Sequence, residues 1–244
     1  MYSAKLDGER ITFGTSGLLY LSNKLMYDRK TNTLWRQFTG EPVVGALADG
    51  GIRLSIFPVV LTHWQEWVAA HPDTTVLDIE TGIYPSSGYV AESDPGAIYY
   101  DYFDSPGTMF PVWLRSNLLD TKTIVLGLRV EGQPKAYPLG KLAQSLVVND
   151  ELGGATLVIA TNPEAGAARA YHGGDRIFAA PPEANRGNRL RFLVDQGNNR
   201  WEVTEEALVN VEDPSVRLER LPSHMAFWFG WYASFPLTRV YGEP

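Results

Sequence analysis

The sequence predicts a β-rich α+β protein made of two pseudo-equivalent antiparallel β units, each with one tryptophan-rich helix, the first unit being incomplete. Three observations carry this prediction: strand-like alternation dominates, helical patterns are few, and the chain repeats itself at a fixed shift. Self-similarity at a fixed shift indicates duplicated structure. A chain of 244 residues is long enough to bury a sizeable core.

The repeat is direct at a shift of 164 residues (228 − 64 = 164). The matched pairs are Arg53 and Arg217, Leu54 and Leu218, Pro58 and Pro222, Trp64 and Trp228, Trp67 and Trp231, Ala69 and Ala233, Pro72 and Pro236, Thr74 and Thr238, and Val76 and Val240. A two-residue gap adds Trp35 and Trp201, so six of the seven tryptophans are matched and Trp113 stands alone. We interpret the matched tryptophans as a duplicated core.

Strand-like patterns occur along most of the chain. Strands are expected in 10–14 and 17–28, and the polar segments 28–35 and 194–201 read as turns that lead into a strand starting with tryptophan. Residues 123–139 alternate around Glu131-Gly132, which predicts a hairpin, and 154–171 predicts two more strands around Asn162-Pro163 and Gly166.

Helical patterns are confined to three segments. Residues 59–70 place apolar side chains on one face, with Thr62 and Gln65 at capping-box spacing and Pro72 as the stop. Residues 223–234 repeat this helix with Ser223 as the expected N-cap, and their nearly continuous apolar character predicts burial. Residues 138–145 are a weaker third helix.

The domain organisation follows from the repeat. We assign 1–81 to the first unit, 82–122 to a Tyr/Gly/Pro-rich connection and 123–244 to the second unit, all within one structural domain. The second unit starts 78 residues before Trp201, whereas 34 residues precede Trp35, so roughly 44 residues of the first unit lack a counterpart. We therefore expect an N-terminally truncated first unit with an exposed sheet edge, which favours association.

Composition narrows the functional classes. A net charge of −7 argues against a nucleic-acid partner, and the absence of cysteine excludes disulfides, thiolate nucleophiles and Cys-type zinc sites. We find no transmembrane run and no apolar signal-peptide core. Histidine spacing predicts no metal site, and no phosphate-binding or dinucleotide motif predicts a cofactor.

Candidate ligand-binding residues are of two kinds: residues present in one unit and absent from the other, which shared packing does not explain, and residues of the motifs at 14–19 and 37–41. They are Ser16, Gly17, Met26, Gln37, Gly40 and His71. Ser16-Gly17 is compatible with a bulge between strands or with backbone amides that line a pocket. Met26 is compatible with a side chain that fills a gap in the core or with a soft-metal ligand. His71 is compatible with a corner between a helix and a strand. A separate carboxylate–aromatic cluster, with Tyr100, Asp101 and Asp104, is compatible with sugar binding or hydrolysis, or with a packed loop.

Several motifs carry a family resemblance. Residues 12–45, 61–77, 132–154 and 227–241 closely resemble segments of the domain of unknown function 3179 (DUF3179) family. That family typically begins with a Tyr-Cys-Pro-Leu-Cys-like motif and a histidine before an Asn-Asp pair, which correspond to the stretch missing here. The resemblance implies an extracytoplasmic location, either secreted, periplasmic or lipid-anchored. It also leaves open a metal or redox site in the full-length family. The segment 234–241 departs from the His-Pro-Asp-Thr ending.

Three functions remain open at this point. The leading expectation is a non-catalytic extracytoplasmic ligand-binding domain with a pocket near Ser16, Met26 and Gln37, for a small molecule or a metal ion. One alternative is a metal- or redox-dependent enzyme whose Cys/His site lies in the missing segment. The other is carbohydrate binding or hydrolysis through the Asp101–Asp104 cluster. The ligand, the reaction and the oligomeric state stay undetermined.

Overall fold

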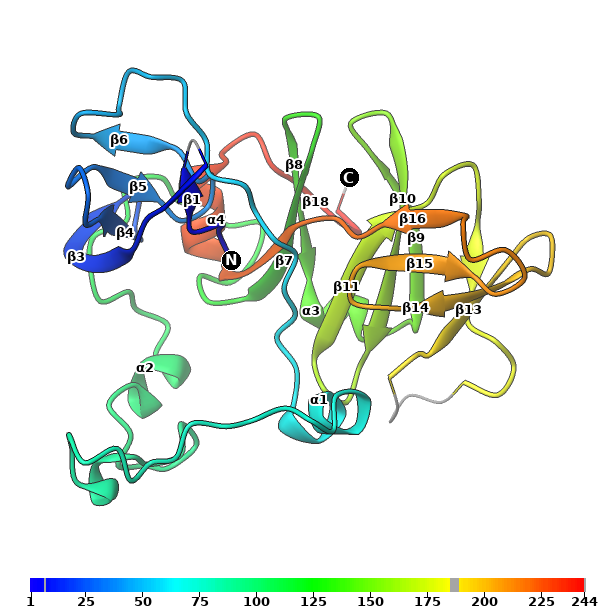
Figure 1. Cartoon of the computed structure of the whole chain (residues 1–244), viewed down its shortest axis with the longest axis horizontal. Coiled ribbons are helices and arrows are strands. Elements are labelled where there is room, and N and C mark those ends of the chain that lie inside the picture. The colour runs from blue at the N-terminus through cyan, green and yellow to red at the C-terminus, as the bar shows by residue number, and fades with distance from the viewer. Residues whose placement is uncertain (7, 185–188, 244) are drawn as a thin grey trace.

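A computed structural model describes residues 1–6, 8–184 and 189–243. Strands make up 35% and helices 11% of the structure, which confirms a β-rich α+β protein. The sheet of residues 13–44 lies at one end of the molecule, and the sheets of residues 147–219 lie at the other. The hairpin of residues 124–138 lies between them (Figure 1). No helix in the described part of the chain is long and apolar enough to cross a membrane.

The N-terminal part forms one four-stranded antiparallel sheet and a two-stranded ribbon. The ribbon is β1 (Lys5–Leu6) with β2 (Glu9–Arg10), and the sheet is β3 (Phe13–Tyr20), β4 (Asn23–Asp28), β5 (Leu34–Arg36) and β6 (Pro42–Val44), paired in chain order. Leu21 and Ser22 adopt φ of 48° and 63° in the β3–β4 turn. Positive φ at both central residues matches the right-handed twist of two paired strands. The turn before Trp35 is present, but the two strands have other bounds than expected: β3 joins the end of 10–14 to the start of 17–28, and the segment 17–28 is a hairpin that turns at Leu21-Ser22.

The remaining strands form three sheets around a larger core. They are β7 (Ile124–Val130), β8 (Gln133–Pro138), β9 (Val147–Leu152), β10 (Ala155–Asn162), β11 (Ala167–His172), β12 (Phe178–Ala179), β13 (Phe192–Asp195), β14 (Arg200–Val203), β15 (Ala207–Asn210), β16 (Arg217–Glu219), β17 (Ser223–Phe227) and β18 (Arg239–Val240). The sheet orders are β11-β10-β9, β12-β13-β14-β15-β16 and β17-β7-β8-β18. The hairpin at Glu131-Gly132 is confirmed, with φ of 48° and 77° at its turn.

Two helix predictions need correction. Residues 223–234 are not one helix: Ser223 begins β17, which pairs with β7, and the helix α4 spans Trp228–Ser234. Backbone pairing with β7 outweighs the helical pattern there, because local propensity is a weak preference that tertiary contacts override. The first helix, α1, spans Trp64–Ala70 and has no side-chain cap, so the Thr62 capping box is wrong. The third, α3, spans Leu139–Leu142.

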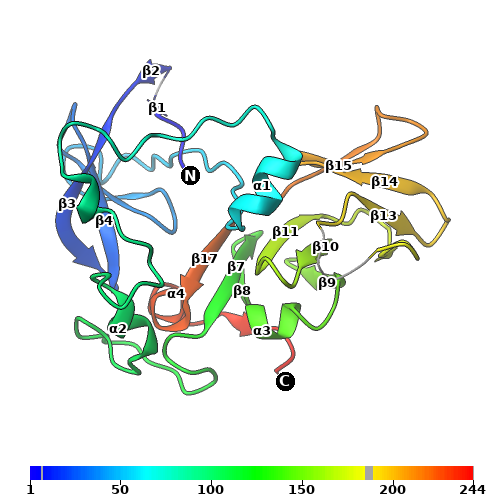
Figure 2. The same cartoon turned by 90° about the horizontal axis from the view of Figure 1, so that it is seen from below.

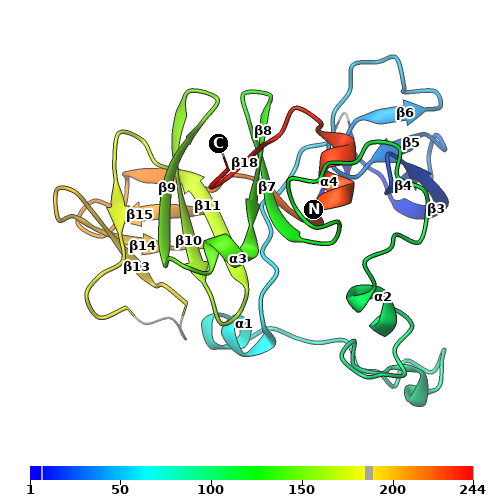
Figure 3. The same cartoon turned by 180° about the vertical axis from the view of Figure 1, so that it is seen from behind.

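The connection between the two parts is extended and exposed. It contains a short 3-10 turn, η1 (Ser86–Gly88), and one helix of five residues, α2 (Tyr100–Asp104). Figures 2 and 3 show it looping away from the sheets before it returns to β7. Ile98 and Trp113 are both at least 90% exposed.

Two of the three matched tryptophan pairs make the same hydrogen bonds in both parts of the chain. Asp28 accepts a 3.0 Å hydrogen bond from Trp35 Nε1, and Asp195 accepts one of the same length from Trp201 Nε1. The second tryptophans of the helices α1 and α4 also donate equivalent hydrogen bonds. Trp67 donates to Thr74 Oγ1 and Trp231 donates to Thr238 Oγ1, each at 2.9 Å. The matched sequences thus fold into the same local geometry.

Candidate functional site

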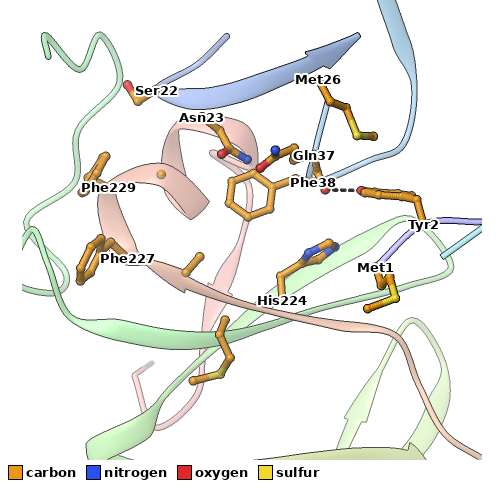
Figure 4. A pocket seen from close by; sticks show the side chains of 13 residues that line it. Met1, Tyr2, Ser22, Asn23, Met26, Gln37, Phe38, His224, Phe227 and Phe229 are labelled. Carbon is orange, nitrogen blue, oxygen red and sulfur yellow. Dashed lines mark hydrogen bonds between the residues drawn. The ribbon is translucent and has the colours of Figure 1, made fainter. Parts of the chain in front are cut away.

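One cavity lies between the first sheet and the β17–α4 segment (Figure 4). Its volume is about 510 Å³, within the range of small-molecule sites. The lining combines the N-terminus, the β3–β4 turn, β4, the turn after β5, β17 and α4. The lining residues are Met1, Tyr2, Ser22, Asn23, Met26, Gln37, Phe38, His224, Met225, Ala226, Phe227, Phe229 and Gly230.

A tight turn after β5 positions Gln37 and Phe38. The Gly40 amide donates to the Arg36 carbonyl at 2.9 Å, and Gly40 has a φ of 69°. A Cβ at Gly40 would come within 2.7 Å of the Tyr2 ring, whose hydroxyl donates to the Gln37 carbonyl. Gly40 therefore lets Tyr2 pack down and does not itself line the cavity.

His224 projects from β17 toward Phe38, as Figure 4 shows. The two rings meet edge to face, with centroids 5.4 Å apart. Burial lowers the pKa of His224 to about 4, and the positive charges of the Met1 amino group and Arg129 act in the same direction. A hydrogen bond to the Phe38 backbone acts in the opposite direction but does not outweigh burial, so the imidazole is neutral at physiological pH. That bond uses one ring nitrogen as a donor and leaves the other as an acceptor.

Aromatic rings make the apolar wall of this cavity. Phe227 and Phe229 stack with centroids 5.9 Å apart, and Phe38 meets Trp231 edge-on at 5.8 Å. Rings held by one another in this way present rigid faces at little cost in conformational entropy. The cavity thus has a fixed aromatic side and a polar side that contains amide and imidazole groups.

A second cavity, of about 860 Å³, lies where α1 meets β10 and the β13–β15 sheet. Its walls include His63 and His71 from the ends of α1, and Glu66, Arg189 and Glu205. The His71 ring lies 4.2 Å from Trp67, and its Nε2 is buried without a hydrogen-bond partner in the described structure. That nitrogen is 4.0 Å from Glu205 Oε1.

A charge cluster forms part of the wall of this cavity. It contains Glu66, Arg189 and Glu205, which line the cavity, and the buried Arg169 and Arg220, which do not. Arg169 is 3% exposed and links two carboxylates, at 2.8 Å from Glu66 and 3.0 Å from Glu205. Glu205 also pairs with Arg189 at 3.1 Å and with Arg220.

The electrostatics of the cluster keep the Glu205 carboxylate ionised. Burial alone would raise the pKa of Glu205, but the guanidinium groups of Arg169, Arg220 and Arg189 hold it below its usual value. Asn162 donates from its side-chain amide to Glu66. Because Glu66 belongs to α1 and the other four groups belong to residues 169–220, the cluster fastens α1 to the second half of the chain.

The six predicted ligand-binding residues separate into three places. Met26 and Gln37 line the first cavity, with Gly40 behind it, and His71 lines the second. Ser16 donates to the Leu25 carbonyl at 2.7 Å inside a β3 bulge, and Gly17 adopts a φ of 75° there. Ser16 and Gly17 line neither cavity, so the expected pocket around Ser16, Met26 and Gln37 does not include Ser16.

The carboxylate–aromatic cluster lies on α2, apart from both cavities. Asp101 and Asp104 are exposed one turn apart, so they belong to a short helix and not to an open loop. Lys122 holds this helix by donating to the Tyr102 and Ser105 carbonyls. Among the described residues, no group of three or more His, Cys, Asp or Glu could hold a metal ion.

Sequence reasoning missed two contributors, His224 and the charge cluster. Glu66 and Arg169 are 103 positions apart, and no local pattern joins them. The repeat did carry a signal: Glu66 matches Gly230 at the shift of 164, so Glu66 also occurs in one unit alone. The rule that selected Met26 and Gln37 would have selected Glu66.

Comparison with known proteins gives a family but no characterised relative. Searches of curated proteins and of solved structures found no match to this chain. The profile of the family described as "Protein of unknown function (DUF3179)" matches residues 1–238. This span includes every motif quoted for the resemblance except the last three residues of 227–241. The chain belongs to the DUF3179 family.

Proposed function

We propose that this chain is a non-catalytic ligand-binding domain whose first cavity takes an uncharged small molecule with a flat apolar part. The lining is the observation that carries this proposal: aromatic rings share the cavity with side-chain amides, and His224 is the one lining residue with an acidic or basic side chain. With His224 neutral, none of the 13 lining side chains carries a charge at pH 7. Burial also lowers the pKa of the Met1 amino group, which weakens the one main-chain charge among the lining residues. A charged ligand would therefore lose its hydration there for little counter-charge in return.

The polar side of the cavity supports a ligand with hydrogen-bonding groups. Asn23 and Gln37 bring side-chain amides, and His224 brings an imidazole. These groups donate and accept, which suits a neutral amide or a hydroxyl. The aromatic wall of Phe38, Phe227 and Phe229 suits a flat ring. An extracytoplasmic setting and a duplicated two-unit architecture remain part of the proposal, supported by the family membership and by the repeated Trp–Asp bonds.

Saturation-transfer NMR with two matched probes tests this proposal. Benzamide is uncharged and planar, and benzoate has nearly the same shape with a negative charge. We expect saturable transfer to benzamide and little to benzoate. Equal transfer to both probes would contradict the selection for an uncharged ligand.

A cavity-filling variant tests the location. Gly230 lines the cavity from α4, and a Cβ built there meets nothing within 4 Å. Gly230→Leu should therefore fill the cavity and remove the benzamide signal. Gly140→Leu is the matched control, because Gly140 is also a helical glycine with open space at its Cβ and lines neither cavity. Benzamide binding that survives in Gly230→Leu would place the site elsewhere.

A further inference from the structure

The matched helices α1 and α4 differ sharply in burial. Trp228 is 1% and Trp231 is 0% exposed, whereas Trp64 is 52% exposed and all of α1 is at least partly exposed. This overturns the interpretation of Trp64 as duplicated core. The helices themselves agree, since both end in a residue with φ near −135° and ψ near 70°. The difference therefore lies in what covers them.

The β7–β8 hairpin covers α4. It occupies the two central positions of the sheet β17-β7-β8-β18, with β17 antiparallel to β7 and β18 parallel to β8. The Trp231 ring rests on the backbone of this hairpin, because a Cβ at Gly127 would lie 2.3 Å from the ring. The packing of α4 on the hairpin thus requires glycine opposite Trp231.

The counterpart of that sheet is empty beside α1. Residues 59–63 match β17 and residues 75–76 match β18, yet neither segment belongs to a strand. Residues 59–62 and 75–76 show no backbone hydrogen bond within the described part of the chain. Val76 is 69% exposed, whereas its match Val240 is 6% exposed. Segments 59–63 and 75–76 therefore resemble β17 and β18 without the hairpin that would lie between them.

The opposite side of α1 is already fixed, because Glu66 pairs with the buried Arg169. The exposed face is ordered as well, since Trp67 Nε1 donates to Thr74 Oγ1 across the helix end. These contacts hold α1 in position without a partner, so its exposed apolar face is pre-organised for binding. Pre-organisation reduces the conformational entropy that association costs.

We propose that residues 59–63, the Trp64–Trp67 face of α1 and residues 74–77, here called the α1 surface, dock a β-hairpin from another polypeptide. One strand of the hairpin pairs antiparallel with 59–63 and the other pairs parallel with 75–76. A glycine or another small residue faces Trp67, as Gly127 faces Trp231. This is strand addition, in which main-chain hydrogen bonds supply affinity and side-chain fit supplies specificity.

The hairpin of this chain provides a probe. A synthetic peptide of residues 122–140 contains β7 and β8 and has no tryptophan, so a change in tryptophan emission reports on the protein. We expect saturable binding to the full chain, with a blue shift as Trp64 leaves water. Hydrogen exchange should slow at residues 59–63 and 74–77. A peptide carrying Gly127→Leu should bind at least about tenfold more weakly, since its side chain meets the Trp67 ring.

Two protein variants locate the binding. Val76→Asp places a charge in the α1 surface and should weaken peptide binding at least about tenfold. Ile177→Asp is the control: Ile177 is also exposed but lies between β11 and β12, and binding should be unchanged.

Three results of the peptide experiments would overturn the proposal. They are an absence of peptide binding, equal binding by both variants, and protection confined to β17 and β18, which would indicate exchange with the native hairpin. A dimer in size-exclusion chromatography that Val76→Asp dissolves would also overturn it, by assigning the α1 surface to a second copy.

Discussion

The Trp231 ring packs directly on Gly127, so closely that a Cβ at position 127 would fall 2.3 Å from the ring. Gly127→Ala must therefore displace either β7 or α4. We expect the free energy of unfolding to fall by about 1–3 kcal/mol, the usual cost of overpacking a core. Urea denaturation measures it. Gly140→Ala, on the exposed side of α3, should be neutral or slightly stabilising, and an equal loss in both variants would contradict the packing argument.

The carboxylate of Asp195 organises the turn before β14. It accepts hydrogen bonds from the Gly197 and Asn199 amides at 2.9 Å and from Trp201 Nε1 at 3.0 Å. Asp195→Ala leaves the buried indole donor without its acceptor, so we expect a loss of about 3 kcal/mol in the free energy of unfolding. Chemical denaturation with the exposed Asp213→Ala as control tests this, and a loss below that of the control would count against it.

The same carboxylate gives an acid dependence. Burial alone would raise the pKa of Asp195, but hydrogen bonds from Asn199, Trp201 and Gly197 hold it below the usual 3.8. Its contribution to stability is therefore complete above about pH 4 and is lost as the pH falls below that value. Unfolding curves between pH 5 and pH 2 should converge for wild type and Asp195→Ala. A gap that stays constant over this range would show that the charge is not involved.

His224 gives the opposite case of a base held neutral. Its pKa of about 4 in the folded chain lies below the 6.5 of the unfolded chain, so the unfolded state takes up the proton first. Its contribution is complete above about pH 6.5, declines as the pH falls from 6.5 to 4, and amounts to at most about 3 kcal/mol. Thermal unfolding of wild type and His224→Gln measures it. The variant should lack this decline, and parallel pH profiles would refute the assignment.

Arg169 holds α1 through Glu66 while it also neutralises Glu205. Arg169→Met leaves both carboxylates with one fewer partner in a buried site, which should cost about 3–5 kcal/mol. Hydrogen exchange across residues 64–71 should accelerate with it. Arg200→Met removes an exposed pair with Glu183 and should cost less than about 1 kcal/mol. Unchanged exchange in Arg169→Met would mean that other contacts hold the helix.

The candidate site was only partly predictable. Met26 and Gln37 were selected because the repeat does not preserve them, and they do line a cavity. His224, which decides the chemistry of that cavity, comes from the other end of the chain and has no local pattern to mark it. Ser16 was selected by its motif, yet its hydroxyl serves a bulge in β3. A motif describes backbone geometry, and a cavity depends on which distant segments meet around it.

The sequence by itself determined the β-rich class, the hairpin at Glu131-Gly132 and the matched positions of the tryptophans, whose indole hydrogen bonds the structure then showed. These depend on turn residues, alternation and short separations, which act within a few residues of one another. Tertiary structure decided that 223–227 is a strand, that Glu66 meets Arg169, and that α1 lies exposed while α4 lies buried. Two helices with the same spacing of tryptophans can be buried or exposed, because the burial of a helix depends on the sheet against which it packs and not on the helix alone.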